Sequence, residues 1–138
     1  MNAAVRRALD SYAETKYEAS ISFADQHTLV AMLFSGLLDS LISVKKALMA
    51  EDLMAKSAAV TKAQGILLGL STTLDFENGG QIASDLAALY DYCLRALVKI
   101  QVENDSSRLQ EVIRIITTLE SAWGSIPEDT RHNFGSQL

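Results

Sequence analysis

The chain has 138 residues, a formal net charge of −5, 49% hydrophobic residues and a single proline. This length favours one domain with its own core, and the scarcity of proline allows long helices. An acidic chain whose Lys and Arg residues are scattered excludes nucleic acid as a partner, because phosphate binding needs a basic face.

The compartment is indicated by the absence of secretory and membrane signals. Arg6 and Arg7 are followed by Ala-Leu-Asp-Ser-Tyr and not by the apolar stretch of a signal peptide. No run approaches the roughly 18 uninterrupted apolar residues that a membrane span needs. A lone cysteine, Cys93, cannot form an internal disulfide and fits a reducing compartment. We expect a cytoplasmic protein that does not insert into a membrane.

The first segment, residues 1–24, is predicted to be an N-terminal extension. A short helix over residues 2–17 would place Tyr12 on its apolar side, and Tyr17 ends it. Residues 20–23 favour an extended or irregular conformation. We expect this extension to lie on the outside of the main fold, attached by few contacts.

The first long helix is predicted to begin at Asp25, whose side chain can accept hydrogen bonds from the free N–H groups of the first turn. Its apolar residues recur at helical spacing in two adjacent sets. The first set is Leu29, Leu33, Leu37, Leu41, Val44 and Leu48, and the second is Val30, Phe34, Leu38 and Ile42. A helix that is apolar over so wide an arc must contact more than one neighbour.

The second helix is predicted to open at Glu51-Asp52, which places acid at its positive end. Its seam repeats every seven residues, a spacing typical of an antiparallel bundle. The seam residues are Leu53, Val60, Leu67 and Leu74, with Ala63, Ile66 and Leu70 between them.

A glycine pair, Gly79-Gly80, predicts a tight break between the second and third helices, because glycine tolerates positive φ. The third helix is expected over about residues 78–102, with Tyr90 and Tyr92 flanking its core stripe. That stripe is Ile82, Leu86, Leu89, Cys93, Leu97 and Ile100.

The fourth helix is predicted to begin after the capping turn Asn104-Asp105-Ser106 and to end at Gly124, with Pro127 preventing its continuation. Its buried face is Leu109, Val112, Ile116, Leu119 and Trp123, widened by Ile113. Residues 126–138 are mostly polar and are expected to be a frayed tail.

Connections of two to five residues make consecutive helices antiparallel neighbours. The predicted fold is therefore all-α: an antiparallel up-down four-helix bundle over residues 25–125, preceded by the N-terminal extension.

Catalytic and metal-binding groups are sparse. The two histidines, His27 and His132, lie near the start of the first long helix and in the polar tail, with nothing to place either beside Cys93. The Glu-x-x-His motifs of a di-iron bundle are absent, and no lysine follows Asn78-Gly79-Gly80 as a phosphate loop requires. We expect neither an enzyme nor a metal or cofactor site.

Recognition of another polypeptide remains, because a wide apolar bundle can receive a partner in its inter-helix grooves. Aromatic rings offer large contact area with a polar tip, although each could equally pack in the core. The candidate partner-binding residues are Tyr12, Tyr17, Phe34, Leu86 and Tyr90.

Several stretches of this chain resemble the flagellar secretion chaperone FliS family. The clearest is residues 74–86, Leu-Asp-Phe-Glu-Asn-Gly-Gly-Gln-Ile-Ala-Ser-Asp-Leu, followed by Leu89-Tyr90-Asp91-Tyr92. The resemblance extends over roughly residues 10–125 and includes motifs from every helix. The other matching stretches are residues 29–36, Lys62-Ala63-Gln64 with Ile66, Ala122-Trp123, and Tyr12 upstream.

The resemblance implies a cytoplasmic export chaperone that binds the disordered C-terminal segment of flagellin. Such a protein blocks premature polymerisation until its client reaches the type III export gate, which would be a second partner. By analogy, the segment with Tyr12 would cover part of the groove and move away when flagellin binds. We expect a monomer or a weak homodimer. An alternative is a flagellar regulatory protein that holds another component, such as an anti-sigma factor.

Overall fold

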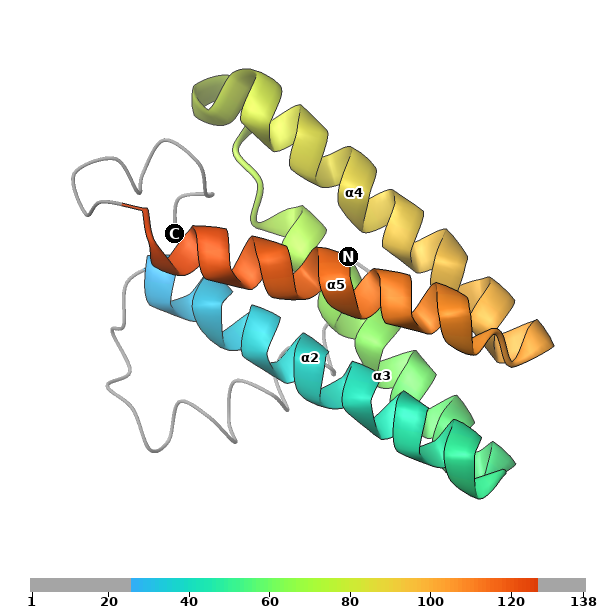
Figure 1. Ribbon diagram of the computed structural model, residues 1–138. Coiled ribbons are helices and arrows are strands. Elements are labelled where there is room, and N and C mark those ends of the chain that lie inside the picture. The colour runs from blue at the N-terminus through green and yellow to red at the C-terminus, as the bar shows by residue number, and fades with distance from the viewer. Residues whose placement is uncertain (1–25, 127–138) are drawn as a thin grey trace.

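The computed structural model describes residues 26–126, which form four α-helices (Figure 1). These are α2 (Gln26–Ala50), α3 (Leu53–Thr72), α4 (Phe76–Glu103) and α5 (Ser106–Gly124). Successive helices run antiparallel; α2 packs against α3 and α5, and α4 packs against the same two helices. The predicted all-α four-helix bundle is confirmed. The N-terminal extension, the cap at Asp25 and the tail beyond Ile126 lie outside the described residues.

The core is a single cluster to which all four helices contribute. Its long aliphatic side chains recur at the helical spacing that the sequence shows, and each helix buries the stripe that faces its neighbours. The largest fully buried side chains are Tyr90, Phe34, Leu37, Leu41, Ile66, Leu67, Leu70, Leu97, Ile100, Leu109 and Ile116.

Aspartates begin three of the helices. Asp52 accepts a hydrogen bond from the backbone N of Ala55 (3.0 Å), and Asp105 does so from the backbone N of Arg108 (3.0 Å). Asp75 caps α4 through Glu77 and Asn78, both 3.1 Å from its Oδ1. Each cap satisfies backbone donors that the first helical turn leaves free, which fixes where the helix begins.

A buried lysine ties α3 to the end of α4. The Nζ of Lys56 donates to the carbonyl oxygen of Gln101 (2.9 Å) and to the Oδ1 of Asn104 (2.7 Å). Asn104 ends α4 in a left-handed conformation with φ 56°, which asparagine adopts more readily than most residues. The lysine thereby gives a hydrogen-bond donor to the backbone carbonyl of Gln101, in the last turn of α4, where no further helical turn supplies one.

The structure corrects the predicted burial of Leu53, Ile82 and Tyr90. Leu53 begins α3 but is 66% exposed, whereas Leu74 lies beyond the end of that helix and still packs, partly buried, against the core. Ile82, predicted to be in the core stripe of the third helix, is 47% exposed, whereas Tyr90, predicted to flank the stripe, is 1% exposed. The physical reason on α4 is helical geometry: Tyr90 lies on the same face as the buried Ala83 and Leu97, each seven residues away, whereas Ile82 is one residue, or about 100°, away from Ala83 around the helix.

Gly80 is where α4 is broken. Its φ of 49° and ψ of −125° interrupt α4 after one turn, so the break lies inside α4 and not between α3 and α4. The preceding helix has already ended at Thr72, with Thr73 as its cap. A residue with a Cβ is strained at this φ, so glycine is required for the chain to change direction here.

α2 is long and apolar enough to cross a membrane by length and composition alone. Nine of its residues, including Leu37, Leu41 and Val44, are buried in the bundle. The core helix of a globular bundle has the same composition, and that is the role of α2 in this fold.

Candidate protein-binding groove

An apolar groove opens between α4 and α5, with its floor on α2. It has a volume of about 320 Å³ and is lined by Phe34, Ile82, Leu86, Leu119, Ala122, Trp123 and Ile126. α4 and α5 make the least contact of the four neighbouring pairs, and α4 diverges from α5 toward its own N-terminal end (Figure 1). The groove lies at this divergent end.

Trp123 is fixed at the floor of the groove by His27. The Nε1 of Trp123 donates to the carbonyl oxygen of His27 (2.9 Å), and the Nε2 of His27 lies 2.8 Å from the carbonyl oxygen of Trp123. Because a carbonyl oxygen only accepts, Nε2 must carry the proton of this imidazole. The two rings also stack, with centroids 5.0 Å apart. The pair joins the start of α2 to the end of α5.

Behind the groove, three rings form a tilted cluster. Phe34 lies 6.4 Å from Tyr90 and 6.4 Å from Trp123, measured between ring centroids. Such tilted contacts are the favourable arrangement for aromatic pairs. Burial raises the pKa of the Tyr90 hydroxyl and raises that of the Cys93 thiol to about 11. Both groups are therefore neutral near pH 7 and suited to a core.

The outer wall of the groove begins directly after the Gly80 break. Ile82 follows this break by two residues, and Leu86 lies one turn further along the same helix. Ile82 lines the groove and is 47% exposed. The wall of the groove therefore begins beside a backbone conformation that only glycine adopts freely.

The residues predicted to bind a partner have different positions. Leu86 is half-buried in the groove wall, and Phe34 contributes to its floor although it is almost fully buried. Tyr90 does not line the groove: it is a core residue that supports Phe34 from behind. Tyr12 and Tyr17 lie outside the described residues.

Sequence reasoning missed the residues that shape most of the groove. Ile82, Leu119 and Trp123 were predicted as core residues, and Ile126 was predicted in the tail. Their apolar character was visible in the sequence, but the divergence of α4 from α5 was not. The only available signal was the Gly-Gly pair ahead of Ile82.

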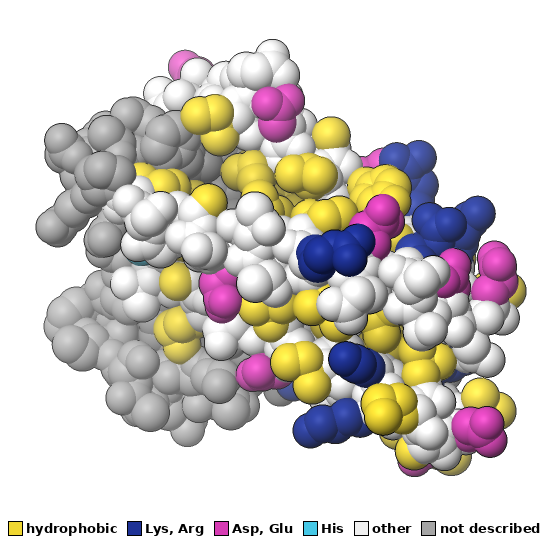
Figure 2. Space-filling view, viewed as in Figure 1, with side chains coloured by type: hydrophobic (Ala, Val, Ile, Leu, Met, Phe, Trp, Pro, Cys, Tyr) yellow, Lys and Arg dark blue, Asp and Glu magenta, His cyan; other side chains and the backbone are white. Residues whose placement is uncertain are grey.

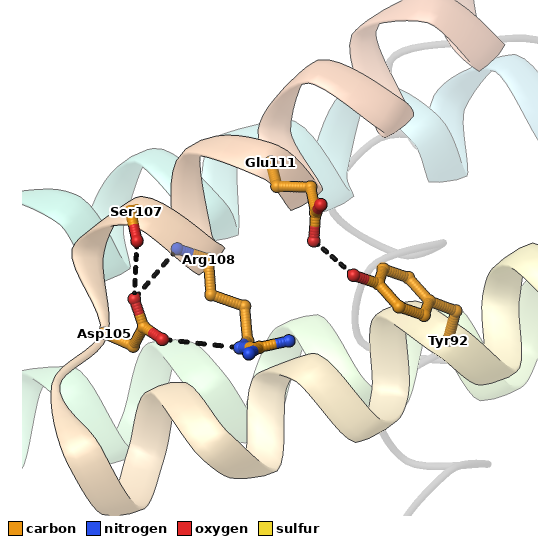
Figure 3. Close-up of polar contacts among 5 residues, drawn as sticks. All are labelled: Tyr92, Asp105, Ser107, Arg108 and Glu111. Atoms are coloured by element: carbon orange, nitrogen blue, oxygen red, sulfur yellow. Dashed lines mark hydrogen bonds and ion pairs between the residues drawn. The ribbon is translucent and has the colours of Figure 1, made fainter.

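A polar cluster lies further along the same two helices, where α4 ends and α5 begins (Figure 3). The hydroxyl of Tyr92 donates to Oε1 of Glu111 and so links the helices. This hydrogen bond raises the pKa of Tyr92, because the phenol donates in its neutral form. The Nε of Arg108 lies 3.4 Å from the Oδ2 of Asp105, whose Oδ1 accepts from Ser107 (2.9 Å).

The end of the bundle away from the apolar groove carries a second, more polar hollow of about 600 Å³. Glu51, Asp52, Lys56 and Asn104 contribute to its lining beside exposed Met49 and Leu53.

Within residues 26–126, no three His, Cys, Asp or Glu side chains are close enough together to hold a metal ion. The apolar groove is lined by hydrophobic side chains and can bury apolar side chains of a partner. It is therefore a stronger candidate for the functional site than the polar hollow.

Comparison with known proteins identifies the family of this chain. The model of the family "Flagellar protein FliS" matches residues 8–130. The flagellar secretion chaperone FliS of Salmonella typhimurium is 35% identical over 119 residues, covering 86% of this chain and 88% of that protein. FliSB of Pseudomonas aeruginosa is 35% identical over 120 residues, with coverages of 87% and 95%. FliS of Vibrio cholerae is 33% identical over 125 residues, with coverages of 91% and 92%.

The bundle defines an all-α protein whose apolar groove is a candidate site for another polypeptide. The family match covers most of the chain. This chain belongs to the FliS family, whose curated members are named flagellar secretion chaperones.

Proposed function

We propose that this protein is a cytoplasmic flagellar export chaperone that binds the C-terminal segment of flagellin. The observation that carries the proposal is the apolar groove between α4 and α5 in a chain of the FliS family. The bound segment would be withheld from contacts with other flagellins, which would prevent premature polymerisation. The complex would then be delivered to the flagellar export gate.

The energetics of such a client favour an apolar groove. A disordered segment loses conformational entropy when it binds, so it must bury much apolar surface to bind tightly. Ile82 and Phe76, both on α4 near the groove end, are large apolar residues that the described chain leaves exposed. Their burial by a client would contribute favourable free energy in proportion to the area covered.

The free protein is proposed to be a monomer or a weak homodimer. We propose that Tyr12 and Tyr17 belong to a segment that covers part of the groove until flagellin binds. Leu86 would contact the client directly, Phe34 would form the floor beneath it, and Tyr90 would act only by supporting Phe34.

The experiment is a binding measurement with flagellin from the same genome. We expect full-length flagellin and its isolated last forty or so residues to form one-to-one complexes, and tail-deleted flagellin to bind no longer. Calorimetry would give the stoichiometry and the affinity. Equal affinity for full-length and tail-deleted flagellin would contradict the proposal.

Two substitutions separate binding from folding. Leu86→Asp places a charge in the groove wall and is expected to weaken binding while the bundle still unfolds cooperatively. Tyr90→Ala empties a core position and is expected to lower the free energy of unfolding by about 3–5 kcal/mol. If Leu86→Asp bound the tail as tightly as the unchanged protein, the groove would not be the site.

A further inference from the structure

The seam between α4 and α5 continues beyond the apolar groove into a cationic hollow. This hollow has a volume of about 240 Å³ and is lined by Tyr92, Arg95, Ala96, Lys99 and Arg108. Figure 2 shows hydrophobic side chains along the seam, with Lys and Arg side chains at the end where α4 finishes and α5 begins. Three cationic residues thus surround a small apolar floor on an otherwise acidic protein.

Arg108 has unused hydrogen-bonding capacity in this hollow. Its Nε faces Asp105 at 3.4 Å, and one terminal guanidinium nitrogen extends to the side away from that carboxylate (Figure 3). Among residues 26–126 these terminal nitrogens have no hydrogen-bond partner. A guanidinium presents paired N–H donors whose geometry matches a carboxylate, so this half-buried fork is suited to a bidentate acidic ligand.

The neighbouring charges leave the hollow cationic. Arg95 pairs with Asp91 at 2.9 Å, but both side chains are largely exposed, so this pair is weak. Glu111 accepts the hydroxyl of Tyr92 and, like Asp91 and Asp105, does not line the hollow, so the charges that line it are all positive. Lys99 is exposed and makes no ion pair within the described part of the chain. An acidic group that enters would therefore meet Lys99 and the free side of Arg108 together.

We propose that this hollow binds the carboxylate of an Asp or Glu side chain in the same client segment that occupies the apolar groove, and so fixes the register of that segment. The proposal rests on the proposed function. The groove and the hollow lie along the same pair of helices: Leu86 lines the first and Ala96 the second, about 15 Å apart at the helical rise. The acidic residue would thus lie roughly ten residues from the apolar anchors in a helical client, or about five in an extended one.

The test is a double-mutant cycle on the complex with the C-terminal segment of flagellin. Arg108→Gln keeps a polar side chain but removes the charged fork, and is expected to raise the Kd about tenfold. Each Asp and Glu of the segment is changed in turn to Asn or Gln. At one of these positions, the substitution in the segment is expected to weaken its binding to the unchanged protein about tenfold. The same substitution is expected to leave binding to the Arg108→Gln variant almost unchanged, because the contact is already lost. Arg114→Gln, which removes an exposed arginine of the same helix outside the hollow, is the control and is expected to bind normally.

The outcomes separate this inference from the proposed function. If Leu86→Asp abolishes binding while Arg108→Gln binds like the unchanged protein, the groove is the client site and the carboxylate contact is wrong. If Arg108→Gln weakens binding but no acidic residue of the segment is coupled to it, the inference is also overturned. If the unchanged protein does not bind the segment, both proposals fail. Thermal unfolding of Arg108→Gln, expected to match that of Arg114→Gln, shows that a loss of affinity is not a loss of folding.

Discussion

Trp123 connects the stability of the bundle to the shape of the groove. One side of the residue is held by reciprocal hydrogen bonds and ring stacking with His27, while its indole also lines the groove floor. The contact joins residues far apart in the chain, the start of α2 and the end of α5. Loosening this pair would therefore disturb the end of the bundle that carries the groove.

Replacing His27 with Ala is expected to lower the free energy of unfolding by about 1–2 kcal/mol, through loss of one hydrogen bond and one ring stack. Urea unfolding at pH 7 measures this change. The control is Gln110→Ala, at an exposed position of α5, which is expected to leave stability unchanged. Equal midpoints and slopes for both variants would show that the His27–Trp123 contact does not stabilise the fold.

Asp75 makes stability depend on acid. Hydrogen bonds from the backbone and side chain of Asn78, and from the backbone of Glu77, hold the pKa of Asp75 below its ordinary value of 3.8. Because the folded-state pKa is the lower one, the contribution of Asp75 is complete above the unfolded value and is lost as the pH falls through the folded value. Asp75→Asn retains the capping oxygen without the titration.

We therefore expect the stability of Asp75→Asn to fall less steeply than that of the unchanged protein as the pH is lowered below about 3.8. Urea unfolding as a function of pH measures the two slopes. An NMR titration of the Asp75 carboxyl carbon gives the folded-state pKa independently. A carboxyl that titrates at or above the ordinary aspartate value would contradict the capping account.

At the scale of the helices, Gly80 determines how α4 begins. Its positive φ ends the first turn, and the helix that restarts there carries Ile82 in the groove wall and Tyr90 in the core. Gly80→Ala forces a Cβ into this conformation and is expected to cost about 1–3 kcal/mol of stability. Gly124, the last residue of α5, has open space around a Cβ and no positive φ, so Gly124→Ala is the matched control.

Thermal and urea unfolding of the two alanine variants provide the comparison. Gly124→Ala is expected to be neutral or slightly stabilising, because alanine is the better helix former by up to about 1 kcal/mol. If Gly80→Ala proved as stable as its control, the break in α4 would not need a glycine.

The helices themselves were largely predictable from the sequence. Apolar residues at helical spacing identified all four, and Asp52 and Asp105 marked the beginnings of two through caps that act locally. The buried face at the start of α4 was not predictable. Ile82 and Ala83 are both apolar, and the sequence does not decide which of them faces the core. The Gly79-Gly80 pair is compatible with a break before the helix or inside it, so the start of the helix was not fixed either.

At the scale of the whole molecule, the groove arises from how two helices diverge. No residue of α4 or α5 alone specifies the opening; it results from the packing of both on α2 and α3. The sequence could therefore identify apolar candidates such as Phe34 and Leu86 but not decide which of them a partner could reach. The cationic hollow was hidden for the same reason, because Arg95 and Arg108 meet only through the antiparallel pairing of their helices.

The central claim is that a flagellin segment binds in the groove between α4 and α5. The most direct measurement compares Ile82→Asp with Val102→Asp in binding the C-terminal segment of flagellin. Both are exposed apolar residues of α4 (47% and 74%), but only Ile82 lines the groove. We predict that Ile82→Asp weakens binding at least about tenfold, because a charge would be buried against the client, and that Val102→Asp binds like the unchanged protein. Equal affinities for the two variants, or a loss confined to Val102→Asp, would contradict the account.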